Sequence, residues 1–141
     1  MASEFTILKQ RGLVLIRHSG FLTFADSMAA FTAYHGHPDF HPAQNALVDF
    51  APITRYEHDP VRLIAFQAQM IERLPPSFSA PPLLIFHAPT GSPGHPLAHA
   101  ILKSWDGLGL RIPRLTETEA EALDIAGQPE RSFASLRAMA S

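Results

Sequence analysis

The sequence predicts a single α/β domain, built on a mixed and mostly parallel sheet of about five strands and about four helices. Two observations support this prediction. After an opening pair of strands, apolar runs alternate with segments of helical periodicity, in the order β-β-α-β-α-β-α-β-α. The chain has 141 residues, a length that suits one domain with its own core. We expect the domain to span residues 1–127, followed by a tail, 128–141, that is flexible or forms a short docked helix.

Apolar segments predict the strands. The first two form an antiparallel hairpin, because the short connection between them ends in Gly12. The third strand is limited by Pro52. The fourth is an uninterrupted apolar run, which is typical of a strand covered on both faces. In the last, apolar and other residues alternate. The expected strands are Phe5–Ile7, Leu13–Ile16, Ala46–Phe50, Leu83–Phe86 and Leu108–Ile112.

The expected helices are recognised by their first residues. Capping boxes start one helix at Thr23 and another in the segment Thr116–Glu119. Asp59 and Pro60 start a helix as a cap followed by proline at the first helical position. A Gly/Pro loop leads into the remaining helix. The apolar faces should consist of Phe24, Met28, Phe31 and Tyr34 in the first helix, Val61, Ile64, Ala68 and Ile71 in the second, and Leu97, Ile101 and Trp105 in the third.

The composition excludes several classes of protein. Cysteine is absent, which rules out disulfide scaffolds, thiolate metal sites and cysteine nucleophiles. The 11 Lys and Arg stand against 13 Asp and Glu, and no basic run indicates a nucleic-acid partner. The longest purely aliphatic or phenylalanine runs are far too short for stable insertion into a membrane. The start of the chain lacks the plan of a signal peptide, so we expect a cytoplasmic protein.

Four short motifs, together with the order of elements, resemble one known family. The hairpin closes on Ser19 and Gly20, and the first helix ends before His37–Phe40. The other two motifs are Ala46–Phe50 and Thr118–Leu123. Over residues 4–127 the chain resembles the STAS-like fold of bacterial anti-sigma-factor antagonists and of the cytoplasmic domains of sulfate transporters, and more narrowly the bacterial SpoIIAA-like family. The resemblance implies a regulatory role, without catalysis, through a protein partner or a small ligand.

The sequence departs from these antagonists at their phosphorylation switch. The antagonists carry a phosphorylatable serine or threonine directly after an aspartate, where a helix begins beyond a central strand, and the added charge prevents partner docking. The matching stretch here runs from Asp49 to Thr54 without an Asp-Ser or Asp-Thr pair. Thr54 is the only hydroxyl near that position. We therefore do not transfer the switch to this chain.

A recognition surface is expected at the carboxyl ends of the strands, where open α/β sheets bind ligands. His87 ends the fourth strand, and the Gly/Pro loop after it lets backbone amides approach a ligand. Arg55, before the second helix, belongs to a patch suited to a partner protein. The expected site consists of Asp49, Thr54, Arg55, His87, Thr90, Gly91 and Gly94. No cofactor is expected.

An enzyme is one alternative function. A hydrolase would pair His87 with Asp49 and use Ser92, Thr54 or His95 nearby, but no nucleophile elbow is present. A metal-dependent enzyme would use His35, His37 and His41 with Asp39, a segment interrupted by a helix end, two prolines and a turn. We therefore expect neither a catalytic nor a metal-ligating residue.

A carrier of an apolar ligand or lipid is the other alternative, since some relatives of the STAS-like fold hold a lipid in a helix-lined cavity. It predicts a large enclosed cavity bounded by Phe24, Phe31 and Ile64. A homodimer is also favoured, because 46% of the residues are hydrophobic and 17% are charged, which leaves few groups to solvate a surface.

Overall fold

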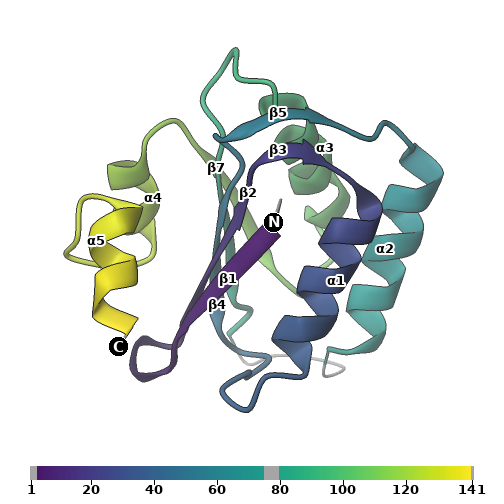
Figure 1. Cartoon of the computed structure of the whole chain (residues 1–141). Helices are drawn as coiled ribbons and strands as arrows, with labels where there is room; N and C mark the ends of the chain where they lie inside the picture. Colours follow the sequence, from purple (N-terminus) through teal and green to yellow (C-terminus); the bar gives the residue numbers. More distant parts are fainter. Residues whose placement is uncertain (1–2, 75–79, 141) are drawn as a thin grey trace.

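In residues 3–74 and 80–140, which the computed structural model describes, a five-stranded mixed sheet lies between two layers of helices (Figure 1). The strand order is β1-β2-β4-β6-β7; β1 runs antiparallel to β2, and all other neighbours are parallel. These results confirm the α/β class and the opening hairpin. The strands are Ser3–Leu8 (β1), Leu13–His18 (β2), Asn45–Asp49 (β4), Leu83–His87 (β6) and Ile112–Thr116 (β7).

Two short strands form a second small sheet that the sequence analysis missed. β3 (Gly20–Leu22) and β5 (Ile53–Tyr56) pair in parallel beyond the carboxyl ends of β2 and β4 (Figure 1). They have 3 and 4 residues, which is too short for a pattern of alternation to be recognised. Leu22 and Ile53 are nonetheless buried, so the small sheet closes one end of the core.

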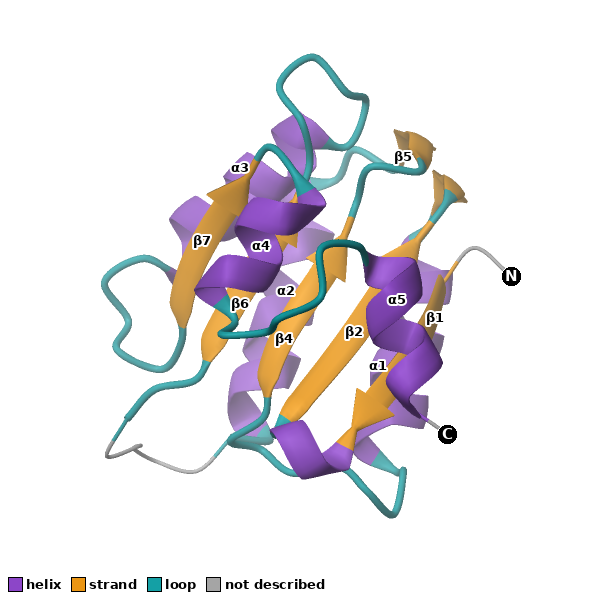
Figure 2. Cartoon of the chain, turned by 90° about the vertical axis from the view of Figure 1, so that its left-hand side faces the viewer, coloured by secondary structure: helices purple, strands orange, loops and turns teal. Residues whose placement is uncertain are grey.

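Five helices occur in the described part of the chain, one more than expected. α1 (Phe24–His35), α2 (Pro60–Glu72) and α3 (His95–Trp105) cover one face of the sheet, and α4 (Glu119–Ile125) and α5 (Phe133–Arg137) cover the other (Figure 2). The side chains of Thr23 and Asp59 accept hydrogen bonds from backbone amides of α1 and α2, which confirms both predicted starts. None of the described helices has the length and apolar character needed to span a membrane.

Two elements near the end of the chain begin later in the sequence than predicted. The strand expected over Leu108–Ile112 begins only at its last residue, because Gly107 and Gly109, at φ of 81° and 73°, turn the chain before it. The capping residue of α4 is Thr118, whereas Thr116 is the last residue of β7. The strand therefore begins four residues later than expected and the helix cap lies two residues later.

The face of α2 that points inward was predicted wrongly at three of its four positions; the fourth, Ile71, does pack against the core. Val61 and Ile64 are 76% and 65% exposed, and Ala68 is exposed as well. Leu63 and Phe66 point inward instead. Apolar residues surround most of α2, so its periodicity does not select one face. Packing against the neighbouring layers decides the orientation.

Each face of the sheet has its own core. On the side of α4 and α5, Leu123 and Leu136 have no exposed surface, and Phe133 is 2% exposed. α5 lies in the segment that was expected to be flexible or to form a short docked helix. Arg11, in the hairpin, binds Glu130 just before α5 through two hydrogen bonds of 2.6 and 3.0 Å. These contacts fix the end of the chain on the sheet.

Candidate functional site

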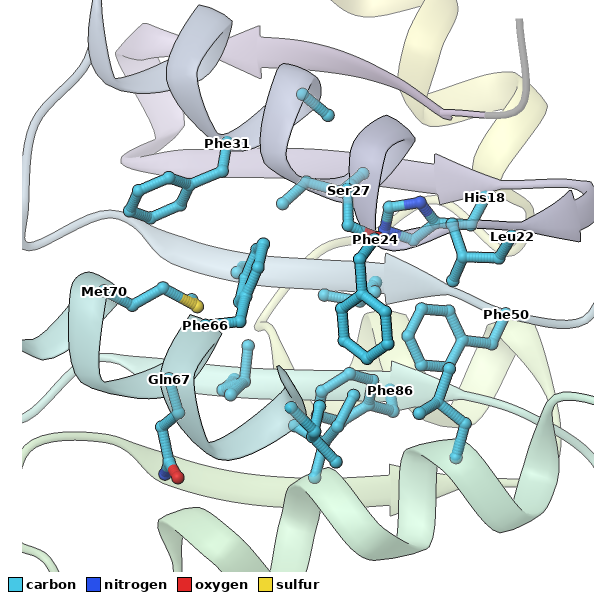
Figure 3. Close-up of a pocket in the computed structure, with 18 of the residues that line it drawn as sticks. His18, Leu22, Phe24, Ser27, Phe31, Phe50, Phe66, Gln67, Met70 and Phe86 are labelled. Carbon is cyan, nitrogen blue, oxygen red and sulfur yellow. The ribbon is translucent and has the colours of Figure 1, made fainter. Parts of the chain in front are cut away.

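A cavity of about 170 Å³ lies between the sheet and helices α1, α2 and α3 (Figure 3). For comparison, an engineered apolar cavity of about 150 Å³ in another protein binds benzene. Most of the surface that surrounds the cavity is apolar. Its aromatic lining residues are Phe5, Phe24, Phe31, Tyr34, Phe50, Tyr56, Phe66, Phe86 and Trp105.

Strand alternation produces the floor of this cavity. Every second residue of a strand faces the same side, so Ala46 and Val48 of β4 and Leu84 and Phe86 of β6 all line it. Small residues leave the space open, since Ala46 on the floor and Ala30 on α1 fill little volume. The phenylalanines of α1 and α2 form the roof (Figure 3).

The seam between α1 and α2 separates the cavity from a groove on the outside of the two helices. Phe24 and Phe66 line both the cavity and this groove, which Met28 and Ala65 also border. The guanidinium of Arg62 lies 4.7 Å from the centre of the Phe24 ring. The rings of Phe24 and Phe66 therefore form part of the wall between the cavity and the groove.

The end of the cavity near the carboxyl ends of the strands carries His18 and Glu57. Nδ1 of His18 lies 2.6 Å from Oγ of Ser3, and burial lowers the pKa of His18 to about 4, so the ring is neutral at pH 7. Glu57 accepts a hydrogen bond of 2.8 Å from the amide of Phe24, at the start of α1. The carboxylate of Glu57 is thus held at a helix N-terminus, and it also pairs with Arg62 at 3.2 Å.

The opposite end carries Arg111, Gln44, Tyr34 and His35. Oε1 of Gln44 accepts a hydrogen bond of 2.6 Å from the hydroxyl of Tyr34, and the Gln44 carbonyl lies 3.5 Å from Nη1 of Arg111. Burial raises the pKa of Tyr34 to about 12. Burial, and then the charges of Arg73 and Arg111, lower the pKa of His35 to about 4. This end is therefore positively charged, with its tyrosine and histidine neutral.

The predicted pair of Asp49 and His87 is present, but it does not face the cavity. Nδ1 of His87 donates a hydrogen bond of 2.9 Å to Oδ1 of Asp49, and both residues are buried. They lie on the side of the sheet covered by α4 and α5, where the ring of Phe133 packs edge-on against His87 at 5.5 Å between centres. The pair thus belongs to the packed face.

Strand register extends this pair into a polar row across the whole sheet. Glu4, Arg17, Asp49, His87 and Thr116 occupy directly paired positions on β1, β2, β4, β6 and β7. Arg17 lies 3.8 Å from Glu4 and 3.9 Å from Asp49. The sequence analysis identified only the two central members, because strand order and register are needed to find the rest.

Thr54 and Arg55 of the expected recognition surface lie on β5 and are exposed. The Arg55 guanidinium covers the ring of Phe21 at 4.2 Å from its centre. Phe21 is itself 43% exposed. These residues form a small surface patch away from the cavity lining.

The three remaining residues of that surface belong to the loop before α3. The hydroxyl and the amide of Thr90 both donate hydrogen bonds to the carboxylate of Glu117, which lower the pKa of Glu117. Gly91 adopts a φ of 87° in the turn. A Cβ on Gly94 would stand 2.6 Å from the carbonyl oxygen of Phe50, so Gly94 is needed for close packing. Each position therefore has a structural role.

The groups considered for a hydrolase form other contacts. Oγ of Ser92 donates to the carbonyl of Pro89 at 2.6 Å, and Nδ1 of His95 donates to the carbonyl of Ala88 at 2.8 Å. Among the described residues, the only hydrogen bond recorded for the side chain of His87 is that to Asp49. The structure therefore brings the Asp–His pair together without a bonded nucleophile.

Two of the histidines considered for a metal site accept hydrogen bonds from nearby backbone amides. Nδ1 of His37 accepts from the amide of Asp39 at 3.0 Å, and Nδ1 of His41 accepts from the amide of Ala43 at 3.1 Å. His35 lines the cavity. Within residues 3–74 and 80–140, no group of three or more His, Asp or Glu side chains is suited to holding a metal ion.

The sequence analysis missed Arg111 as a candidate. A signal was present, because Arg111 is the single charged residue between Leu108 and Pro113. Its position at the cavity depends on the turn before β7 and on the end of α1, which are far apart in the sequence.

Comparison with known proteins does not supply a family. No protein-family model matches the chain, and no curated protein or solved structure gives a significant match.

Proposed function

We propose that this protein binds a small apolar ligand, without chemical conversion, in the cavity between the sheet and helices α1, α2 and α3. The observation that carries the proposal is the cavity of about 170 Å³ with its aromatic lining. Burial of apolar surface stabilises a complex by about 25 cal/mol per Å², so such a cavity favours an apolar ligand over water.

The packing of the two long helices supports this proposal. Protein interiors are normally close-packed, and an empty cavity costs stability. α2 has 13 residues, all described, and none of them is buried; in α1, with 12, Phe31 is the buried one. A ligand in the cavity would supply the apolar contacts that these helices lack. Phe24 and Phe31 line the cavity as a carrier requires, although Ile64 does not.

The resemblance to the STAS-like fold is compatible with this function, since some relatives of that fold hold a lipid. Membership of the SpoIIAA-like family, a cytoplasmic location and a homodimer remain predictions. A regulatory role through a protein partner also remains a prediction, with the patch around Arg55 as its surface.

Trp105 provides a direct test of the cavity. It is the only tryptophan in the sequence, is 2% exposed and lines the cavity, so its fluorescence should respond to an occupant. Titration with octan-1-ol should give a saturable change with a dissociation constant on the order of 0.1 mM, as expected for a ligand of this size. A strictly linear response would reject the proposal.

Two alanines of α1 offer a matched pair of variants. Ala30→Phe fills the cavity, whereas Ala33→Phe adds the same ring at an exposed position. We expect the first to weaken binding at least tenfold and the second to leave it unchanged. Ala46→Leu, which fills the cavity from the sheet side, serves as a second blocking variant if Ala30→Phe does not fold. Unaltered binding in a folded blocking variant would contradict the proposal.

A further inference from the structure

Resting on the proposed function, we propose that the ligand is an amphipathic monocarboxylate of about six to ten carbon atoms. Its carboxylate binds the guanidinium of Arg111, and its apolar body extends along the aromatic lining of the cavity. Ligands of this class share one acidic group attached to an apolar acyl or aryl body.

Arg111 lacks a counter-charge among the described residues. Seven ion pairs occur among residues 3–74 and 80–140, and Arg111 takes part in none of them. Its one recorded hydrogen bond is to the carbonyl of Gln44 at 3.5 Å, which is long for an N–H···O bond. A partly buried cation is costly without a partner, and arginine remains charged under all ordinary conditions.

The hydrogen-bond donors at this end of the cavity match the shape of a carboxylate. A guanidinium presents five N–H groups in a plane and matches a carboxylate with two parallel hydrogen bonds. His35 lines the same end and is neutral at pH 7, so its ring retains an N–H donor. Gln44, 5% exposed, is held by Tyr34 and by the carbonyl of Asp39, and it fixes the position of the carbonyl that contacts Arg111.

The two ends of the cavity differ in how their charged groups are paired. Glu57 lines the end near the carboxyl ends of the strands and is paired with Arg62 at 3.2 Å, whereas Arg111, at the other end, has no carboxylate partner among the described residues. An anionic head group is therefore attracted to the Arg111 end. The rings of Phe24, Phe31 and Phe66, from α1 and α2, line the cavity (Figure 3). The ligand therefore has one orientation, with its head beneath the end of α1.

The size of the cavity limits the apolar body. At about 170 Å³ it is only slightly larger than a cavity that takes a benzene molecule. A ring or a medium-length acyl chain fits, whereas a chain of 16 or more carbons, roughly twice the proposed length, does not fit inside.

The test compares octanoate with octan-1-ol, which share an apolar chain and differ in charge. Binding is followed by Trp105 fluorescence and by calorimetry at pH 7. We expect the wild type to bind octanoate at least tenfold more tightly than octan-1-ol. In Arg111→Met, octanoate should lose at least tenfold more affinity than octan-1-ol does, because only octanoate carries the charge that Arg111 binds. Arg114→Met, at an exposed arginine three positions away, should alter neither.

The outcomes separate this inference from the proposed function. Equal binding of the two ligands by the wild type, or full octanoate affinity in Arg111→Met, would overturn the carboxylate while leaving the cavity as a binding site. Absence of binding by both ligands would overturn both proposals. If Arg111→Met does not fold, the inference is tested by the two affinities of the wild type and by the octanoate affinity of Arg111→Gln. A parallel titration with 3-phenylpropionate shows whether the body is aryl or acyl.

Discussion

The two faces of the sheet are built from the same strands, yet the helices that cover them are packed differently. On one face, α3 buries Leu97, Ala98 and Trp105, but α1 and α2, with 12 and 13 residues, bury only Phe31 and leave a cavity. On the other face, α4 and α5, with 7 and 5 residues, bury Ala122, Leu123, Phe133 and Leu136. Helix length therefore does not determine burial. The short helices α4 and α5 complete a core, whereas α1 and α2 enclose a space.

The two faces also differ in whether their polar groups are paired. The face of α4 and α5 pairs its central polar groups with each other, as in the bond between Asp49 and His87. The cavity face leaves Arg111 without a carboxylate among the described residues. A satisfied polar pair stabilises the fold, and an unpaired charge beside a cavity is available to a ligand.

The largest expected effect comes from truncating a leucine of the packed face, with a leucine of the cavity face as the comparison. Leu123→Ala leaves a hole in a fully packed core and should lower the free energy of unfolding by about 2–5 kcal/mol. Leu63→Ala only enlarges an existing cavity and should cost about 1 kcal/mol. Urea titration of both variants measures the difference. Equal losses would mean that the two faces are packed alike.

The second prediction concerns pH and His18 on the cavity face. Its pKa is about 4 in the folded protein and about 6.5 in the unfolded chain, so between these values only the unfolded chain binds the proton. The free energy of unfolding should therefore fall as pH decreases from 6.5 to 4, by on the order of 3 kcal/mol from His18 alone.

Urea titrations at several pH values measure this dependence. His18→Gln should reduce it, because glutamine does not titrate; the part that remains includes the contribution of His35, whose pKa is also lowered to about 4. His99→Gln, at an exposed position on α3, should leave the slope of the wild type. An unchanged slope in the first variant would assign the pH dependence to other groups.

The smallest effect is expected at the polar pair of the packed face. Asp49→Ala removes the acceptor of His87 and of the amide of Ala51, 3.1 Å from Oδ1, and should cost about 1–3 kcal/mol. Asp49→Asn retains an oxygen acceptor and should cost less. Ligand binding should be unchanged in both, since the pair lies on the other face from the cavity. A loss of octan-1-ol binding in either folded variant would contradict the separation of the faces.

Local features of the sequence predicted much of this fold. The caps at Thr23 and Asp59 and the turn at Gly12 depend on residues that are neighbours in the chain, and the structure has them as expected. The prediction for the inward face of α2 was wrong at Val61 and Ile64, because these residues are as apolar as Leu63 and Phe66, which point inward. Where local signals are equal, contacts with distant residues decide.

For the candidate site, the sequence indicated the pair of Asp49 and His87 and a carrier lined by Phe24 and Phe31, but not the charged end of the cavity. The order of elements and the alternation along strands depend on residues that are close together in the sequence. The sequence alone therefore determined the α/β layers. Arg111 meets Gln44 and the end of α1 only after the sheet has formed and the helices have crossed it. The presence of the cavity and the charge at its end were decided by the tertiary structure, because both are formed by segments that lie far apart along the chain.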